Sequence, residues 1–420
     1  MHHFSYHFTL KFRTALLAFT CLFCLSAVNA AYIVADIDSG VWDVAATWSN
    51  NAALNGGLDY LVDKTDLLSN GAYSVRTPDV TGASRTFGGK SLTLNNGRMI
   101  IKTSNSLEID DLRLNGAGVI TFWRSDVTCS LSGNISLSGT NNQFQSTNNT
   151  LLDITSTLSG DGQLVILGSG SGSTAGSGQV SLSGDNTGFT GDTKVTNGWL
   201  VVNNANALVN STLDMTGMAA GGGAVTLGSS ATAFNLGGLK GGGANIIGDV
   251  TISGIHAPGS SPGLDTITGD LTYSGGSSEV QWELASNAIG VAGTNFDQIQ
   301  VGNDLDFSGA TSLSLIFDST GSTVKWSDSF WQSEYLGTDG WLVFDVDYDS
   351  NGGGLSNFSN LNLSSTYLDS DGIALPSYYS FGLEEINGDI YLTFAIPEPS
   401  TMLLAGLGLA GLVLRRRKRK

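Results

Sequence analysis

Charged side chains are scarce in this chain. Asp, Glu, Lys and Arg make up 13% of its 420 residues, about half of the roughly 25% that is typical of soluble proteins. Because Lys, Glu and Arg normally fill the exposed face of an amphipathic helix, long helices of that kind are not expected. The 56 glycines and an apolar content of 41% instead favour many short β-strands separated by turns, and they argue against disorder.

Basic residues are scarcer still in the main part of the chain. Of the 19 lysines and arginines, Lys11 and Arg13 precede Ala31 and six others form the end of the chain. Residues 31–399 therefore hold 11 basic and all 37 acidic residues, so that their net charge is −26. Nucleic-acid binding requires cationic contacts to phosphates, and no nucleic-acid partner is expected.

Histidine and cysteine are nearly absent from the same region. Between positions 31 and 399, His256 is the only histidine and Cys129 the only cysteine. We therefore expect no intrachain disulfide and no His/Cys zinc cluster there, and a Ser-His-Asp arrangement would have to use His256, beside a Gly/Pro turn. Cys129 lies in a strand-like run and is expected to be a small buried apolar side chain. Carboxylate-based chemistry is the enzyme chemistry that these absences leave open.

The N-terminal segment, residues 1–30, has the layout of a secretory signal peptide. A positive flank and an apolar run over residues 15–25 are followed by small residues at 28–30. We expect a signal helix that directs Sec export and is cleaved between Ala30 and Ala31. An uncleaved anchor or a buried helix is the alternative.

The end of the chain combines a short apolar segment with a basic tail. The motif Pro397, Glu398, Pro399 precedes an uncharged run over residues 400–414. Fifteen residues span about 22 Å as a helix, which suffices to sit in a roughly 30 Å hydrocarbon core only if flanking arginines reach the interface. The tail that would do so is basic throughout and begins with Arg415, Arg416 and Arg417. Because basic residues stay cytoplasmic, we expect the body outside the inner membrane; a buried C-terminal helix is the alternative.

This order of Pro-Glu-Pro, short apolar helix and arginine cluster resembles the PEP-CTERM sorting signal of bacteria with a double envelope. The resemblance implies anchoring in the inner membrane and then processing by an exosortase near residues 397–399. It further implies transfer of residues 31 to about 399 to the cell surface, or their release.

A seven-residue pattern recurs along the body. Two apolar residues separated by one polar residue, with glycine at both ends, occur at 133–139, 178–184, 248–254 and 269–275, with a looser copy at 303–309. Such alternation makes a short strand with one buried face. The separations between the starts of the first four copies are close to multiples of roughly 22, the length of one coil of a parallel β-helix. We predict an all-β solenoid, about a dozen coils forming a rod about 60 Å long; two packed sheets are the alternative.

Residues 182–208 resemble an autotransporter-associated β-strand repeat, and residues 256–263 resemble a turn that is frequent in autotransporter passengers. The resemblance implies a right-handed parallel β-helix. Because the sequence ends at Lys420, a short distance after Ala395, we expect the sorting signal in place of the translocating domain of an autotransporter, and no self-translocation.

The solenoid is expected to carry β caps, because its open ends would expose unpaired strand edges. Trp42 and Trp48 mark the first cap, and Trp326, Trp331 and Trp341 the second. The expected segments are a signal peptide at 1–30, an N-terminal β cap at 31–90, the solenoid at 91–310, a C-terminal β domain at 311–395 and the sorting signal at 396–420.

One acidic segment has the spacing of a calcium loop. Asp347, Asp349 and Asn351 match its opening, but Phe358 stands where a bidentate glutamate belongs. A second fragment starts at Asp369. Ordinary turn composition is the favoured interpretation, so no cofactor is expected, with calcium as the alternative.

Two other features of the sequence are relevant to carbohydrate binding and to carbohydrate cleavage. The second-cap tryptophans are expected to pack in the cap, with stacking on sugar rings as the alternative. Asp304 and Asp306 would share a strand face, and Glu384 and Glu385 are adjacent. Carboxylate pairs can serve a glycosidase or lyase, although an acidic chain forms such pairs freely.

These features predict an exported, non-catalytic cell-surface or extracellular-matrix protein, adhesin-like or structural, associated with biofilm exopolysaccharide. A carboxylate-based polysaccharide lyase or hydrolase is the alternative. A calcium-stiffened structural protein is the third interpretation.

Overall fold

The computed structural model describes residues 32–395 apart from 65–72, 126, 148, 169–177, 219–222, 228–232, 242–244, 260–261, 333–339, 348–353 and 365–366. Both predicted terminal helices lie outside these residues. The same holds for the cleavage site at Ala30 and Ala31, for Pro397, Glu398 and Pro399, and for Arg415, Arg416 and Arg417.

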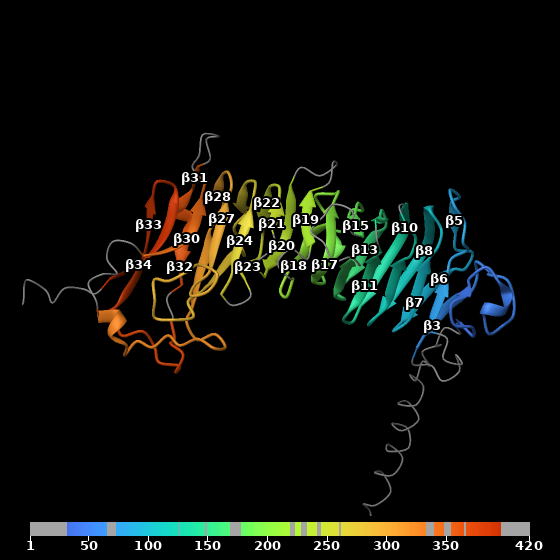
Figure 1. Cartoon of the computed structure of the whole chain (residues 1–420), viewed down its shortest axis with the longest axis horizontal. Helices are drawn as coiled ribbons and strands as arrows, with labels where there is room; N and C mark the ends of the chain where they lie inside the picture. The colour runs from blue at the N-terminus through green and yellow to red at the C-terminus, as the bar shows by residue number, and fades with distance from the viewer. Residues whose placement is uncertain are drawn as a thin grey trace, which may run out of the picture.

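The chain coils through two long ladders of parallel strands, which together form an elongated body (Figure 1). The first ladder joins β1 (Ile33–Val34), β3 (Asp59–Asp63), β6 (Ser91–Asn95), β8 (Asn105–Asn115), β10 (Thr128–Ser138), β12 (Leu151–Ile154), β15 (Gln179–Leu182), β17 (Thr193–Val202), β19 (Gly223–Leu227), β21 (Asn245–Ile247), β24 (Leu264–Ile267), β27 (Gln298–Val301) and β30 (Trp341–Val346). The second joins β2 (Gly40–Val41), β4 (Ser74–Arg76), β7 (Arg98–Ile101), β9 (Val119–Phe122), β11 (Asn142–Ser146), β14 (Leu164–Gly168), the first half of β17, β18 (Leu208–Asp214), β20 (Phe234–Lys240), β22 (Val250–Ile252), β25 (Leu271–Tyr273), β28 (Leu305–Phe307) and β31 (Leu355–Ser356). Within the described ranges each ladder thus has thirteen parallel strands, with β17 counted in both.

Further parallel strands pair alongside these ladders. They are β5 (Arg85–Thr86), β13 (Thr157–Gly160), β16 (Gly188–Phe189), β23 (Ile255–Ala257), β26 (Glu279–Glu283), β29 (Thr311–Ile316) and β32 (Leu361–Leu363). An antiparallel hairpin of β33 (Ser380–Ile386) and β34 (Asp389–Ala395) closes the first ladder through β30. Helical structure in the described part of the chain is limited to the 3-10 turns η1 (Ala45–Thr47), η3 (Ser329–Gln332) and η5 (Phe358–Asn360). No helix found there has the length and apolarity to cross a membrane.

The register of the ladders gives the length of a coil. Leu92 pairs with Leu112, and Ile246 pairs with Ile267, spacings close to the predicted coil length of roughly 22 residues. Insertions lengthen other coils, as between Ile267 and its partner Val301. The predicted all-β class is confirmed, and the mostly parallel pairing is consistent with a solenoid. The right-handed sense stays a prediction, as do the domain boundaries at 90 and 310, which the first ladder crosses.

The seven-residue pattern does not mark one position of the coil throughout. Val250, Leu271 and Leu305, from the last three copies, stack directly in the second ladder. The copy that holds Val180 lies in the first ladder, where the β10–β12–β15 register places Val180 above Cys129. The interpretation of the spacings as whole coils in register therefore holds for the copies at 248–254 and 269–275 and is wrong for the earlier copies. The pattern encodes a strand and its turn, which fit either ladder, while insertions change the path between copies.

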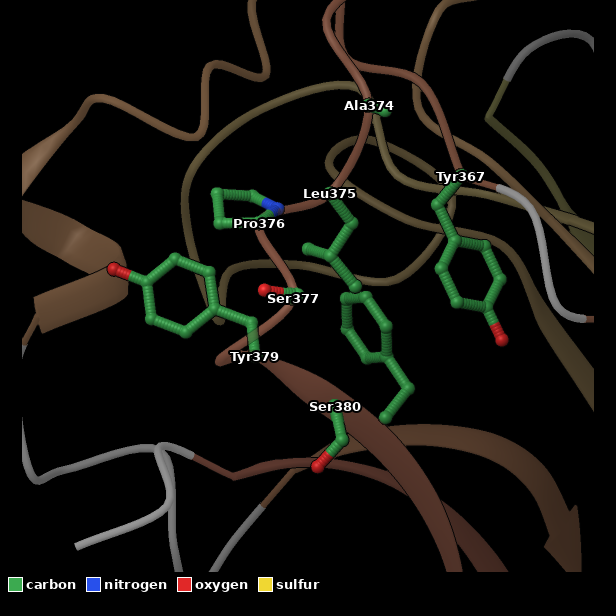
Figure 2. Close-up of a pocket in the computed structure, with 8 residues that line it drawn as sticks. Tyr367, Ala374, Leu375, Pro376, Ser377, Tyr379 and Ser380 are labelled. Carbon is green, nitrogen blue, oxygen red and sulfur yellow. The ribbon is translucent and has the colours of Figure 1, made fainter. Parts of the chain in front are cut away.

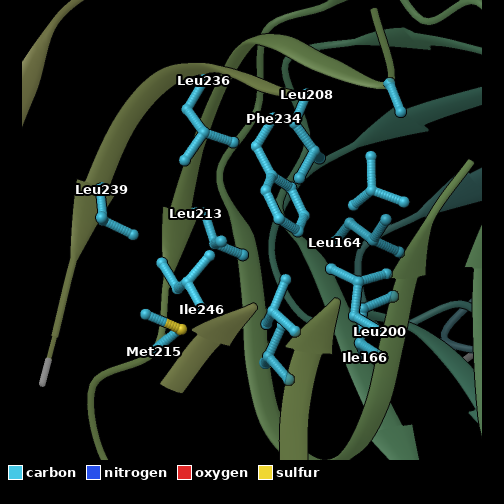
Figure 3. Close-up of a cluster of buried hydrophobic side chains, with 14 of the residues drawn as sticks. Leu164, Ile166, Leu200, Leu208, Leu213, Met215, Phe234, Leu236, Leu239 and Ile246 are labelled. Carbon is cyan, nitrogen blue, oxygen red and sulfur yellow. The ribbon is translucent and has the colours of Figure 1, made fainter. Parts of the chain in front are cut away.

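Apolar side chains that alternate along the strands fill the space between the ladders. In the middle of the body the buried stack includes Leu164, Ile166, Leu200, Leu208, Leu213, Met215, Phe234, Leu236, Leu239 and Ile246 (Figure 3). Burial of each such side chain contributes about 1.5–3 kcal/mol of transfer free energy. Cys129 belongs to this core with no exposed surface, as predicted, and burial raises the pKa of its thiol to about 12. Stacking of like residues in successive coils therefore supplies one continuous core.

Gly133 shows why glycine recurs at the bends. Its φ is +105°, and the β8–β10 register shifts between it and Asn134. A Cβ at this position would lie 1.9 Å from the carbonyl oxygen of Ile109 on the neighbouring coil. The bend therefore requires both the left-handed conformation and the close backbone approach that glycine permits.

Clustered aromatic rings occupy both ends of the body. Near the N-terminal end, Trp48 packs on Tyr60 with ring centroids 4.8 Å apart, and its Nε1 donates a 2.7 Å hydrogen bond to the carbonyl of Trp42. Near the C-terminal end, the ring of Trp331 lies 4.9 Å from those of both Trp326 and Phe394. These rings shield from water the apolar interior that the last coils would otherwise expose.

The hairpin leaves one strand edge open. Within the described residues β33 pairs with β34 alone, and its last residues, including Glu384 and Glu385, are exposed. Charged side chains on an edge strand oppose pairing with another chain. The two glutamates therefore protect the C-terminal end of the first ladder.

Removal of these charges is expected to cause association. The double change Glu384→Val and Glu385→Thr should convert monomers into dimers or larger assemblies. Valine and threonine have high β-propensity, and without the two charges the open edge of β33 can pair with a strand of another chain. Light scattering coupled to size-exclusion chromatography measures this. Glu108→Val, on the paired strand β8, should stay monomeric. A double variant with the elution and mass of the wild type would contradict the edge role.

Candidate functional site

A polar hollow of about 620 Å³ lies on the outer face of the first ladder, across β24, β27 and β30. We call it the outer groove. Two rows of outward residues line it in successive coils. One row contains Thr266, Gln300 and Asp345, and the other contains Thr268, Gly302 and Asp347. Asn303 completes the polar lining.

Gly302 lines the outer groove without contributing a side chain. A Cβ there would lie 2.5 Å from the carbonyl oxygen of Thr268, so that the neighbouring coil also excludes a larger residue. Between the outward rows, Ile267, Val301 and Val346 point into the core and are buried. The groove floor is thus held by the same packing that holds the coil.

Hydrogen bonds connect the outward row across three coils. Thr266 Oγ1 donates to Gln300 Oε1 at 3.1 Å, and Gln300 Nε2 donates to Asp345 Oδ2 at 3.2 Å. Nearby, the backbone N–H of Val346 donates to Asp389 at 2.9 Å. Burial raises the pKa of Asp389, and the negative charge of Asp345 raises it further by a smaller amount. Hydroxyl, amide and carboxylate groups in a fixed row can exchange hydrogen bonds with the hydroxyls of a sugar polymer.

Of the three residues that match the opening of the calcium loop, only Asp347 lies within the described residues, exposed at the rim of the outer groove. Asp349 and Asn351 lie outside them. In the described ranges no group of three or more His, Cys, Asp or Glu side chains is placed to hold a metal ion. Asp369 is buried and accepts backbone hydrogen bonds from Trp326, Asp371 and Ile373, so its carboxylate organises a turn. Calcium binding stays a prediction.

The acidic pair on either side of Leu305, the first residue of β28, is hydrogen-bonded to the neighbouring coil. Asp304 accepts a hydrogen bond from the backbone N–H of Gly354 at 2.7 Å, and Asp306 accepts one from Asn357 Nδ2 at 2.7 Å. Both donors belong to the next coil. These contacts give the two carboxylates a structural task, which is to hold the segments on both sides of β31.

The second-cap tryptophans do not form a sugar-binding face. Trp326, Trp331 and Trp341 are buried, because the cap closes over them, and packing is the interpretation that the structure confirms. Trp123 is the exposed tryptophan of the described residues, with 56% of its surface accessible. The ammonium of Lys102 lies 4.7 Å from its ring centroid, in a cation–π contact.

Sequence reasoning missed a second concave site, in the C-terminal cap (Figure 2). This cap pocket has a volume of about 350 Å³. Its lining consists of Tyr367, Ala374, Leu375, Pro376, Ser377, Tyr379, Ser380 and Phe381. The concentration of aromatic residues between 367 and 381 was the available signal, but only folding places them around one hollow.

His256 lies in the core rather than at a surface site. Its Nδ1 is 2.7 Å from the hydroxyl of Tyr273, its Nε2 is 3.0 Å from Asp265 Oδ2, and all three side chains are fully buried. Burial raises the pKa of Asp265, against the hydrogen bond from His256, and burial also raises that of Tyr273. With no exposed surface, this polar group has no contact with a polymer outside.

Asp297 lies near this group in the same coils. Its two oxygens accept backbone hydrogen bonds from Gly263 at 2.6 Å and Glu283 at 2.9 Å. Burial nevertheless raises the pKa of Asp297 to about 8. Burial therefore opposes ionisation of this carboxyl group inside the solenoid.

Comparisons with known proteins give a match at the end of the chain. No curated protein and no solved structure matches. The autotransporter-associated repeat predicted at residues 182–208 is not confirmed by a family match, although Leu182 and Val202 pair across neighbouring coils as a one-coil unit would. Residues 395–418 match the PEP-CTERM protein-sorting motif, which indicates an exported protein that an exosortase sorts by a C-terminal, membrane-anchored signal.

Proposed function

We propose that this chain is a non-catalytic cell-surface or extracellular-matrix protein that binds exopolysaccharide through its outer groove. The observation that carries this proposal is the position of the sorting motif, which starts at the last residue of β34. Processing near residues 397–399 would therefore free an elongated body with almost nothing attached.

The groove suits a polymer for geometric reasons. Neighbouring strands of a parallel ladder lie about 4.8 Å apart, so outward side chains repeat along the body at a fixed interval. Thr266, Gln300 and Asp345 are already oriented by the hydrogen bonds between them. Preorganised groups lose little conformational entropy on binding, which favours a weak, repeated contact with sugar hydroxyls.

Co-sedimentation tests the proposal. The purified full chain is expected to sediment with exopolysaccharide from the producing bacterium and to leave the length of the polymer unchanged. Thr268→Trp, which fills the groove, should weaken binding about tenfold, equivalent to about 1.4 kcal/mol. Thr140→Trp, at an exposed bend outside the groove, is the matched control and should bind like the wild type.

Two results would overturn the proposal. Polymer that becomes shorter would favour a carboxylate-based lyase or hydrolase instead. Absence of co-sedimentation, or equal binding by the Thr268→Trp variant, would remove the outer groove as the polysaccharide site.

A further inference from the structure

We propose that the cap pocket binds a single neutral pyranose residue. This inference rests on the proposed association with polysaccharide, but it concerns a second site, formed by other residues than those of the outer groove. Four features of the pocket support it: its aromatic walls, its free hydroxyls, its lack of charge and the rigidity of its frame.

The aromatic walls of the pocket are the first feature that supports sugar binding. The rings of Tyr367 and Phe381 lie 5.3 Å apart at 79°, and the ring of Tyr379 stands on the other side of Leu375 and Ser377 (Figure 2). The C–H bonds of a pyranose ring form an apolar face that packs against such rings. The pocket volume of about 350 Å³ lies at the small end of ligand-binding cavities, as expected for one sugar residue rather than a long oligosaccharide.

The hydroxyl groups at the rim of the pocket are the second feature that supports sugar binding. Ser377 and Ser380 are exposed, and no described residue accepts or donates a hydrogen bond to either hydroxyl. Each hydroxyl can both donate and accept, as can each hydroxyl of a sugar. The pocket therefore offers mixed apolar and hydroxyl surface, which matches the two kinds of surface on a pyranose.

The absence of charged groups from the described lining favours a neutral ligand. Among the residues that the structure describes, the lining contains no carboxylate, ammonium or guanidinium group. Residues 31–399 together carry a net charge of −26, and this field repels an anionic sugar such as a uronate. With no cationic partner in the pocket to offset that repulsion, an uncharged hexose residue fits and a uronate does not.

The frame of the pocket is preorganised. Leu375 N–H donates to the carbonyl of Tyr367 at 3.0 Å, and Tyr379 N–H donates to the carbonyl of Pro376 at 2.9 Å. The hydroxyl of Tyr367 donates to the carbonyl of Ser364, and Tyr379 packs on Phe394 of β34 with ring centroids 4.9 Å apart. Walls fixed in this way need not be ordered by the ligand, so even a small sugar can bind measurably.

Saturation-transfer NMR on the full chain tests the proposal. The probes are methyl β-glucopyranoside, methyl β-galactopyranoside and glucuronate. At least one neutral glycoside is expected to receive saturation from aromatic protons with a Kd of about 1 mM, and glucuronate is not. Ser377→Trp should fill the pocket and weaken binding at least about tenfold, whereas Ser277→Trp, an exposed serine far along the chain, should leave it unchanged. Ser380→Ala removes one rim hydroxyl with little risk to folding and should weaken binding by a smaller factor.

The outcomes separate this proposal from the preceding one. If neither neutral glycoside binds, or if Ser377→Trp binds as well as the wild type, the cap pocket is not a sugar site. In that case co-sedimentation that depends on Thr268 would still support the outer groove. Glycoside binding that Ser377→Trp abolishes, without polymer co-sedimentation, would support the cap pocket and overturn the groove.

Discussion

Raising the pH from 5 to 8 is expected to lower the free energy of unfolding by about 3–4 kcal/mol, because of Asp297. Burial raises the pKa of this carboxyl from 3.8 to about 8 in the folded protein. Between these two values the folded state retains a proton that the unfolded state has released, so stability falls as the pH rises, by about 1.4 kcal/mol per pH unit. The loss is complete once the pH exceeds the folded pKa.

Other shifted carboxyls do not reverse this trend. Asp265 also has a raised pKa, because of burial, and acts in the same direction. The pKa values of Asp59 and Asp185 are lowered, mainly by hydrogen bonds from Ser91 and Asn206. Such groups change stability below their ordinary pKa of 3.8, which lies outside the range of the experiment.

Thermal melts followed by circular dichroism at pH 5, 6, 7 and 8 measure the effect. Asp297→Asn keeps the size of the side chain but cannot titrate, so its melting temperature should vary much less with pH. It should already be lower at pH 5, because an amide can accept only one of the two backbone hydrogen bonds from Gly263 and Glu283. Asp185→Asn, at the surface, should retain the slope of the wild type. A wild-type melting temperature independent of pH would contradict the assignment.

His256→Leu is expected to destabilise the fold by about 3–5 kcal/mol. The change leaves Asp265 and the hydroxyl of Tyr273 buried without the hydrogen bonds that the imidazole provides. A buried polar group that loses its partner keeps its full desolvation cost. Chemical unfolding in urea at pH 7, compared with the wild type, measures the loss.

A double variant distinguishes the cost of the missing partner from the cost of a changed shape. With Asp265→Leu added to His256→Leu, the carboxyl group that lost its partner is gone, and at least half of the lost stability should return. If the double variant is less stable than the single one, shape rather than polarity dominates at this position. A single-variant loss below about 1 kcal/mol would show that the His256–Asp265 contact contributes little.

Much of the architecture was predictable from local pattern. Alternation of apolar and polar residues over three to five positions, as in residues 250–252 and 271–273, specifies a strand with one buried face wherever it occurs. The scarcity of Lys, Glu and Arg excluded long amphipathic helices for the same local reason. The sorting motif at residues 395–418 was also recognisable directly, because a linear signal that an enzyme recognises needs no folded partner.

Register and site geometry were not predictable, since they depend on residues far apart in the chain. Coil lengths vary with insertions, so the spacing of the repeats did not show which copies stack. The tryptophans of the second cap became buried because segments distant in the sequence close over them, as in the hydrogen bond from Trp341 Nε1 to the carbonyl of Ala288.

The sequence by itself determined the strand class, the acidic charge of the body, the absence of a disulfide framework and the sorting signal, since each depends on composition or on neighbouring residues. The tertiary structure alone decided that Thr268, Gly302 and Asp347 line one groove, and that Tyr367 and Phe381 line one pocket. It also decided that His256 meets Asp265 and Tyr273 in the core. Each of these outcomes requires one coil to be placed on the next, and that placement follows from the packing of the whole stack.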